Sequence, residues 1–220
     1  MNKKEIIAKI EKEAKKFFEG ASGCHDWTHV ERVKNLAIHI GKKEKADLFV
    51  LEAAALLHDI GRKEEMKCEG KFCHAEKGAE MAKNILEKYK IEKKQVENII
   101  HCIEVHRWRK NKKPETLEAR IIFDADKLDS IGAIGIARDF LFAGHSGSNC
   151  LYTGNEKKLA KEEKNYSYGK EDSALLEYEI KLKYIYKKIM TKSGKEVARE
   201  RQKYMDEFFK RFEKEIKGVM

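Results

Sequence analysis

Apolar residues recur at helical spacing along most of the chain. In residues 2–19 they stand three and four positions apart, which places them on one face of a helix. The same spacing predicts further helices over residues 27–40, 47–57, 74–89, 93–106, 116–129, 132–142, 172–190 and 195–215. No stretch alternates apolar and polar positions with β-branched residues, as a half-buried strand would. The pattern therefore predicts an all-α fold.

This pattern also predicts a single domain, a helical bundle that spans residues 1–220. The chain has one proline, Pro114, and no linker rich in proline, glycine or serine. Residues 47–57 are apolar on most sides of the helix they would form, and such a helix belongs in the middle of a bundle. Polar residues or glycines interrupt the helical spacing at residues 62–73 and 144–169, where we expect loops.

Several predicted helix ends carry residues that commonly cap helices. Asp26 and Thr116 stand where an N-cap belongs, directly before an apolar repeat. Gly41 is expected to end the helix that Asp26 begins. Ser193 followed by Glu196 has the spacing of a capping box, which places a helix start there.

Charge and cysteine content limit the partners of the chain and its compartment. Lysine and glutamate alternate along nearly every segment, so the net charge of +9 is typical of solvated helix faces and argues against a nucleic-acid partner. No apolar run approaches the ~20 residues of a membrane span, so no membrane partner is expected. The five cysteines are odd in number and follow a charged N-terminus, which predicts free thiols in the cytoplasm. The sequence leaves the oligomeric state open.

Histidine and aspartate interrupt three of the predicted apolar helices. His29 lies early in one helix, His58 and Asp59 end the most apolar one, and three aspartates stand within residues 124–129. Charged groups placed against a core are costly unless something compensates them, and neighbouring carboxylates repel one another. A divalent cation resolves both difficulties, and imidazole with carboxylate suits transition metals. Alternatively, the His58–Asp59 pair is a helix cap, and Asp129 caps a helix or pairs with a lysine.

Three motifs resemble those of the HD superfamily of metal-dependent phosphohydrolases. They are H-x-x-R-V at residues 29–33, A-A-L-L-H-D-I-G at residues 54–61 and D-A-D-K-L-D at residues 124–129. More narrowly, residues 22–33 and 118–138 resemble a bacterial and archaeal subfamily, some of whose members are similar to nucleotide pyrophosphohydrolases. The resemblance implies an HD-type bundle with its motif-bearing core at about residues 22–139 and additional C-terminal helices at about residues 172–215.

The resemblance also implies the metal site. It makes His29, His58, Asp59 and Asp126 the ligands of one divalent ion, which is Mn, Mg, Co, Ni, Fe or Zn, and makes Asp59 catalytic. His25 also precedes an aspartate, but the first ligand of the family corresponds to His29. Some HD enzymes have a catalytic glutamate shortly after the histidine–aspartate pair. This chain has none at residues 60–63, and Glu64 and Glu65 come only later, so the general base is open.

Further residues are candidates to bind the substrate. Arg62 and Lys127 adjoin the implied ligands and would balance phosphate charge. His74, His101 and His106 fall where two-metal HD enzymes place extra ligands. We expect His74 and His101 to contact a substrate phosphate rather than a second metal, and the spacing of five keeps His101 and His106 from sharing one helix face.

The expected function is hydrolysis of a nucleotide phosphate anhydride or ester by a metal-activated water, with nucleoside triphosphate cleaved to monophosphate and pyrophosphate. Nucleoside monophosphatase or phosphodiesterase activity is one alternative, and a nucleotide-binding regulatory module with little turnover is another. The long glycine-bearing segment 144–169 is expected to cover the site, with His145, Tyr152, Tyr166 and Tyr168 as candidate contacts.

Overall fold

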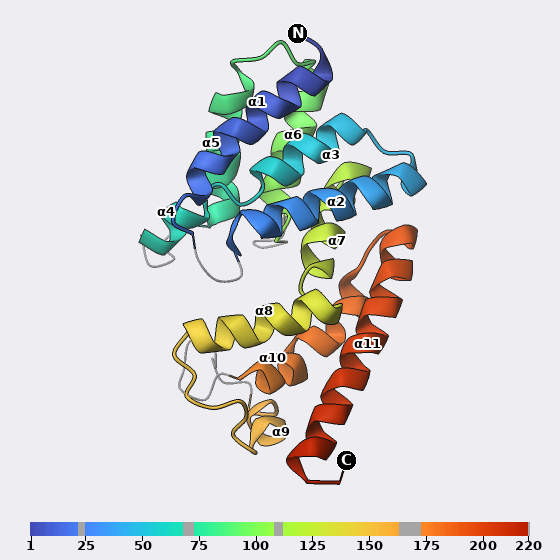
Figure 1. Ribbon diagram of the computed structural model, residues 1–220. Coiled ribbons are helices and arrows are strands. Elements are labelled where there is room, and N and C mark those ends of the chain that lie inside the picture. The colour runs from blue at the N-terminus through green and yellow to red at the C-terminus, as the bar shows by residue number, and fades with distance from the viewer. Residues whose placement is uncertain (22–24, 68–72, 108–111, 163–172, 220) are drawn as a thin grey trace. The chain divides into compact units, whose positions relative to one another are not determined.

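The protein is described by a computed structural model that covers residues 1–21, 25–67, 73–107, 112–162 and 173–219. Every regular element within these residues is a helix, which confirms the predicted all-α fold (Figure 1). The elements are α1 (Lys3–Lys15), η1 (Lys16–Phe18), α2 (Trp27–Glu44), α3 (Leu48–Leu57), α4 (Arg62–Lys67), α5 (His74–Leu86), α6 (Lys93–Val105), α7 (Leu117–Leu128), α8 (Gly132–His145), α9 (Glu156–Leu159), α10 (Ala174–Ile180), η3 (Leu182–Lys188) and α11 (Lys192–Ile216).

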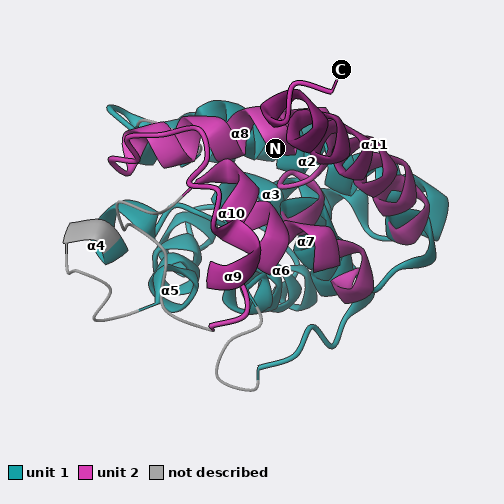
Figure 2. Cartoon of the chain, turned by 90° about the horizontal axis from the view of Figure 1, so that it is seen from below, with its two compact units in different colours: residues 1–126, 190–194 teal, residues 127–189, 195–220 magenta. Residues whose placement is uncertain are grey.

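The chain forms two compact units. One unit consists of residues 1–126 and 190–194, and the other of residues 127–189 and 195–220 (Figure 2). The expectation of a single domain over residues 1–220 stays a prediction. Among the described residues, no helix combines the length and the apolar content that a membrane span requires.

Helix α3 is the core of the first unit. All of its residues except Leu48 and Glu52 are buried, and it packs against α1, α2 and α6. The sequence prediction of a central helix at residues 47–57 is therefore supported by the packing, with Asp47 as its N-cap. Because α3 ends at the interior of the unit, the residues that follow it, His58 and Asp59, are almost completely buried.

Helix α2 continues past the glycine at which we expected it to end. It runs to Glu44, and Lys45 ends it in the left-handed conformation at φ 60°. A Cβ atom on Gly41 would lie 2.2 Å from the Cδ1 atom of Leu51. Gly41 therefore lets α2 approach α3 closely and does not terminate the helix.

The polar stretch after Asp59 is helical at its start, so the prediction of a loop over residues 62–73 was wrong for residues 62–67. The backbone N–H groups of Arg62 and Glu65 donate to the carbonyl oxygens of Asp59 and Gly61. These bonds carry the chain directly from Asp59 into α4. Residues 68–72 lie outside the described part of the chain.

The second unit is built on α8, α10 and α11. Helix α10 packs against α8, and Phe140 of α8 lies in ring contact with Phe209 of α11. The helix predicted at residues 172–190 is two elements, α10 and η3, which meet at Lys181. Gly132, at φ +78°, lies against the side chain of Arg201, where a Cβ atom would be 3.0 Å from Arg201 Cγ.

The last helix begins earlier than the capping-box pattern predicted. Helix α11 starts at Lys192, and the hydroxyl of Thr191 accepts the N–H of Gly194, so Thr191 is the capping residue. Ser193 lies inside the helix, and its N–H donates to Glu44.

Segment 144–169 is only partly described. It contains the short helix α9, whose buried Glu156 accepts from the hydroxyl of Ser173 at 3.4 Å. Residues 163–172, including Tyr166 and Tyr168, lie outside the described residues. The covering role of the segment stays a prediction.

Candidate metal centre

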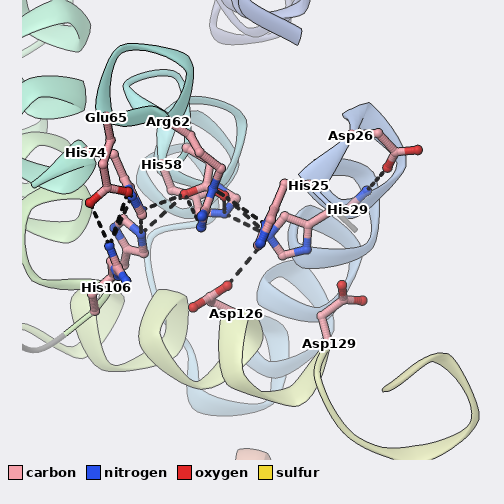
Figure 3. A network of polar contacts seen from close by, with 12 residues as sticks. His25, Asp26, His29, His58, Arg62, Glu65, His74, His106, Asp126 and Asp129 are labelled. Atoms are coloured by element: carbon pink, nitrogen blue, oxygen red, sulfur yellow. Dashed lines mark hydrogen bonds and ion pairs between the residues drawn. The ribbon is translucent and has the colours of Figure 1, made fainter. Parts of the chain in front are cut away.

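The four predicted metal ligands meet in the first unit. The Nε2 atoms of His29 and His58 lie 3.3 Å apart, and Asp59 Oδ2 lies 3.7 Å from the first and 3.8 Å from the second. Asp126 Oδ1 lies 3.6 Å from His29 Nε2 (Figure 3). Three segments distant in sequence, α2, the end of α3 and α7, thus direct two imidazole nitrogens and two carboxylates to one place.

Local structure fixes the direction of the two histidines. The side chain of Asp26 is the N-cap of α2, as predicted, and accepts the backbone N–H of His29 at 3.2 Å. His58 is the C-cap of α3, and its Nδ1–H donates to the carbonyl oxygen of Ala55 at 2.8 Å. This bond selects the tautomer in which Nε2 of His58 carries an electron pair toward the centre.

The electrostatic setting keeps these side chains ready to bind a cation. Burial lowers the pKa of His58, which therefore stays neutral. Burial raises the pKa of Asp59. The positive charge of Arg62 and the neighbouring histidines outweigh burial and hold this pKa well below its ordinary value. Neutral imidazoles and ionised carboxylates are the forms that bind metals. The donor set therefore fits the divalent transition metal that the sequence predicts.

The second oxygen of Asp59 faces another pair of histidines. Asp59 Oδ1 lies 3.1 Å from His74 Nε2 and 3.5 Å from His106 Nε2, and the two Nε2 atoms lie 3.3 Å apart. His106 Nδ1 donates to the carbonyl oxygen of Ile103 at 2.7 Å, which turns its Nε2 toward Asp59. Asp59 thus spans two groups of possible metal ligands, one on each carboxylate oxygen.

A glutamate reaches this second group through α4. Glu65 Oε2 lies 2.5 Å from His74 Nδ1, and Arg107 Nη1 lies 3.2 Å from Glu65 Oε1. Burial raises the pKa of Glu65, but the contacts with His74 and Arg107 outweigh it and lower the pKa overall. The sequence suggested that no glutamate follows the histidine–aspartate pair closely enough. The helical turn of α4 explains how Glu65 nevertheless reaches His74.

The predicted substrate-binding residues are placed differently from one another. His74 is fully buried against Asp59, and Arg62 binds Asp59 through Nε at 2.8 Å and Nη2 at 3.4 Å. His101 is in none of the three ligand groups among the described residues, and its Nε2 accepts the N–H of Glu115 at 3.1 Å. Lys127 directly follows Asp126 on α7. Phosphate contact by any of the four stays a prediction.

Two residues at the centre were missed or set aside by the sequence reasoning. His106 was passed over in favour of His101, although the spacing argument correctly required that only one of them face the site. His25 Nδ1 lies 3.9 Å from Asp59 Oδ2, and its ring makes an edge-on contact with His29. The sequence signal for His25 was its place one residue before the N-cap of the helix that carries His29.

Two of the three aspartates in residues 124–129 do not share the cation that we expected. Asp124 accepts the N–H groups of Met190 and Thr191, each at 2.8 Å. Asp129 pairs with Arg138 at 2.6 Å, where a lysine or a cap was the expected alternative. The prediction that one cation relieves all three was wrong, because only Asp126 faces the imidazoles.

Comparisons with known proteins agree with this geometry. A family model described as HD domain matches residues 26–131, which contain all four predicted ligands. The uncharacterized protein YpgQ of Bacillus subtilis (strain 168) is 35% identical over 203 residues, covering 90% of this chain and 87% of that protein.

Solved structures share the fold over nearly the whole chain. The crystal structure of Bacillus subtilis YpgQ in complex with ADP has a TM-score of 0.74 and 30% identity, and the match covers 100% of this chain and 99% of that one. An HD-superfamily hydrolase from Bacillus thuringiensis has a TM-score of 0.73 and 29% identity, with 98% and 99% covered. These matches confirm the all-α fold predicted from sequence.

Proposed function

The chain belongs to the HD-domain family of hydrolases, and from this premise we propose that it is a metal-dependent phosphohydrolase that acts on nucleotides. We propose further that it cleaves nucleoside triphosphate to monophosphate and pyrophosphate. The observation that carries the proposal is the meeting of two imidazole nitrogens and two carboxylates from α2, the end of α3 and α7.

One divalent ion is held by His29, His58, Asp59 and Asp126. Such an ion, when bound, polarises a phosphoryl oxygen and acidifies a water molecule. Asp59, His74 and His106 offer a second set of similar chemistry. We favour occupation of the first set because it has two carboxylates, those of Asp59 and Asp126. The second set has only the carboxylate of Asp59, which both sets share.

The surrounding residues orient the ligands and balance charge. Arg62 holds Asp59 in place through Nε and Nη2, and its side chain is 22% exposed. A guanidinium that binds a carboxylate through Nε and Nη2 can use Nη1 to donate to an incoming phosphate. Lys127, which adjoins Asp126, is the second candidate for this role. Glu65 contacts His74 Nδ1 and orients that ring, and Arg107 donates to Glu65 in turn.

A nucleotide substrate is supported by similarity to YpgQ, whose crystal structure contains ADP. A nucleoside monophosphatase or a phosphodiesterase would use the same ligand set and stays an alternative. The regulatory-module alternative was motivated by the apparent lack of a glutamate near the metal pair. Contact of Glu65 with His74 weakens that motive.

The test is a screen of nucleotides against a panel of divalent metals, with pyrophosphate and orthophosphate measured separately. Pyrophosphate release from triphosphates supports the proposal, and orthophosphate release supports the first alternative. Activity must disappear with a chelator and return with added metal. Tight nucleotide binding without release of either product would support the regulatory module instead.

A further inference from the structure

We infer that His25 is a further ligand of the proposed metal ion, one that an oxygen of the substrate can displace. The inference rests on the proposed function and adds a residue to its site. His25 lies outside the four ligands that the family motifs imply, and it enters because its Nδ1 lies 3.9 Å from Asp59 Oδ2.

Three imidazole nitrogens surround the same oxygen of Asp59 at nearly equal distances. They belong to His25, His29 and His58, at 3.9, 3.7 and 3.8 Å. In octahedral coordination, ligand atoms about 2.1 Å from one ion lie about 3.0 Å apart as neighbours and about 4.2 Å apart across the ion. The observed distances fall between these values, so each of the three nitrogens can share an ion with Asp59 Oδ2 after small side-chain movements.

Two overlapping groups of ligand atoms share His29. One contains His25 and Asp59, the other contains His58 and Asp126, and within each group the atoms lie within 4.8 Å of one another. Because His29 belongs to both, a cation bound to it lies beside both groups. His25 and Asp59 would then join His58 and Asp126 as ligands of that ion.

His25 differs from the other ligands in exposure. Its side chain is 33% exposed, against 17% for Asp126 and 1% or less for His29, His58 and Asp59. Its Nδ1 atom is nevertheless buried, and its ring lies beside that of His29 (Figure 3). A substrate that arrives from solvent therefore meets His25 before it meets the buried ligands.

The backbone allows His25 to leave without disturbing the site. It precedes the N-cap Asp26 and so lies outside α2, whereas His29 is fixed within the first turn of that helix. Rotation about the side-chain bonds of His25 moves its ring while α2 stays in place. A neutral imidazole also removes no charge when it leaves, so an anionic phosphate oxygen can take its position beside the ion.

The experiment uses Co²⁺ as the probe, because its visible absorption reports the number and type of its ligands. His25→Ala and His25→Gln are compared with the wild type and with His39→Ala, which removes an exposed histidine of α2. Each protein is titrated with Co²⁺ against a competing chelator, with and without inorganic phosphate. Circular dichroism verifies that each variant is folded.

Both His25 variants should bind one Co²⁺ with about 10- to 100-fold lower affinity and an altered spectrum. His39→Ala should match the wild type. Saturating phosphate should bring the wild-type spectrum to that of His25→Ala with phosphate, because His25 has then left the ion.

Identical affinity and spectrum in the wild type and in folded His25 variants would overturn the inference. A spectral difference that persists at saturating phosphate would overturn the displacement, because His25 would then be a permanent ligand. Failure of the metal site itself has a different signature. In that case wild-type Co²⁺ binding would be no stronger than that of His58→Ala.

Discussion

Two buried regions of the first unit, built around carboxylates only two residues apart on α7, differ in how their charge is compensated. Asp124 is fully buried and accepts hydrogen bonds from two backbone N–H groups and from the hydroxyl of Thr191, at 2.7–2.8 Å. Asp126 faces His29 at 3.6 Å, which is longer than a hydrogen bond. Asp124 therefore fixes the start of α11, while the surroundings of Asp126 suit a cation.

The difference shows how a structural carboxylate can be told from a ligand. Donors at hydrogen-bond distance already compensate the charge of Asp124, and Arg138 does the same for Asp129 in the second unit. At the metal centre Arg62 compensates part of the charge of Asp59 at 2.8 Å, but the Nε2 atoms of His29 and His58 lie 3.3 Å apart and Asp126 Oδ1 lies 3.6 Å from His29 Nε2. A cation between these ligand atoms would stabilise the arrangement.

The largest effect is expected from removal of a ligand. His58→Ala and Asp126→Ala should each lower the affinity for a divalent ion by at least about a thousandfold, about 4 kcal/mol. Elemental analysis after gel filtration measures bound metal, and circular dichroism checks that the helices persist. His39→Ala is the control. Full metal retention in both ligand variants would contradict the assignment.

Asp124→Ala should act on stability instead of metal binding. It removes three charge-assisted hydrogen bonds and leaves the buried N–H of Thr191 without its acceptor. We expect the free energy of unfolding to fall by about 3 kcal/mol or more. Denaturant titration measures this loss. At temperatures where the variant is folded, its metal affinity should stay within about threefold of that of the wild type. A loss of metal affinity as large as that of Asp126→Ala would contradict the distinction between the two aspartates.

The sequence predicted the fold class because apolar spacing reports helices directly. It was less accurate at helix ends. Gly41 was interpreted as a terminator, but it permits a close contact with Leu51 that only the tertiary structure creates. The start of α11 was placed at Ser193, because the role of Thr191 depends on Asp124, a residue 67 positions away.

The predicted ligands could be named from sequence because each stands in a short motif on a helix. The residues that surround these ligands in the structure, such as Glu65 and His106, do not stand in such a motif. Glu65 reaches His74 only because α4 is helical, and the polar composition of that stretch favoured a loop. His106 and His101 are equally placed in sequence, and only the rotation of α6 decides which of them faces Asp59.

A moderate effect is expected from Glu65→Gln. Glutamine keeps the size of the side chain but removes the charge that holds His74, and His74 in turn contacts Asp59. Loss of such a supporting carboxylate should weaken metal binding by about 10- to 100-fold. Isothermal titration measures the affinity and the stoichiometry together. Glu64→Gln, at the adjacent position of α4, is the matched control, and equal affinities in the two variants would show that Glu65 does not support the site.

The smallest effect on the metal centre is expected from His101→Ala, which compares two histidines of one segment. His101 Nε2 accepts the N–H of Glu115, whereas His106 Nε2 faces Asp59. His101→Ala should lose about 1 kcal/mol of stability, the value of one hydrogen bond, and should leave metal affinity and KM unchanged. His106→Ala should weaken metal binding, because it removes a buried neighbour of Asp59. The two variants are compared by metal titration and steady-state kinetics.

A rise in KM for His101→Ala with unchanged metal affinity would support the phosphate contact that the sequence predicted. It would mean that the hydrogen bond between His101 and Glu115 breaks when substrate binds.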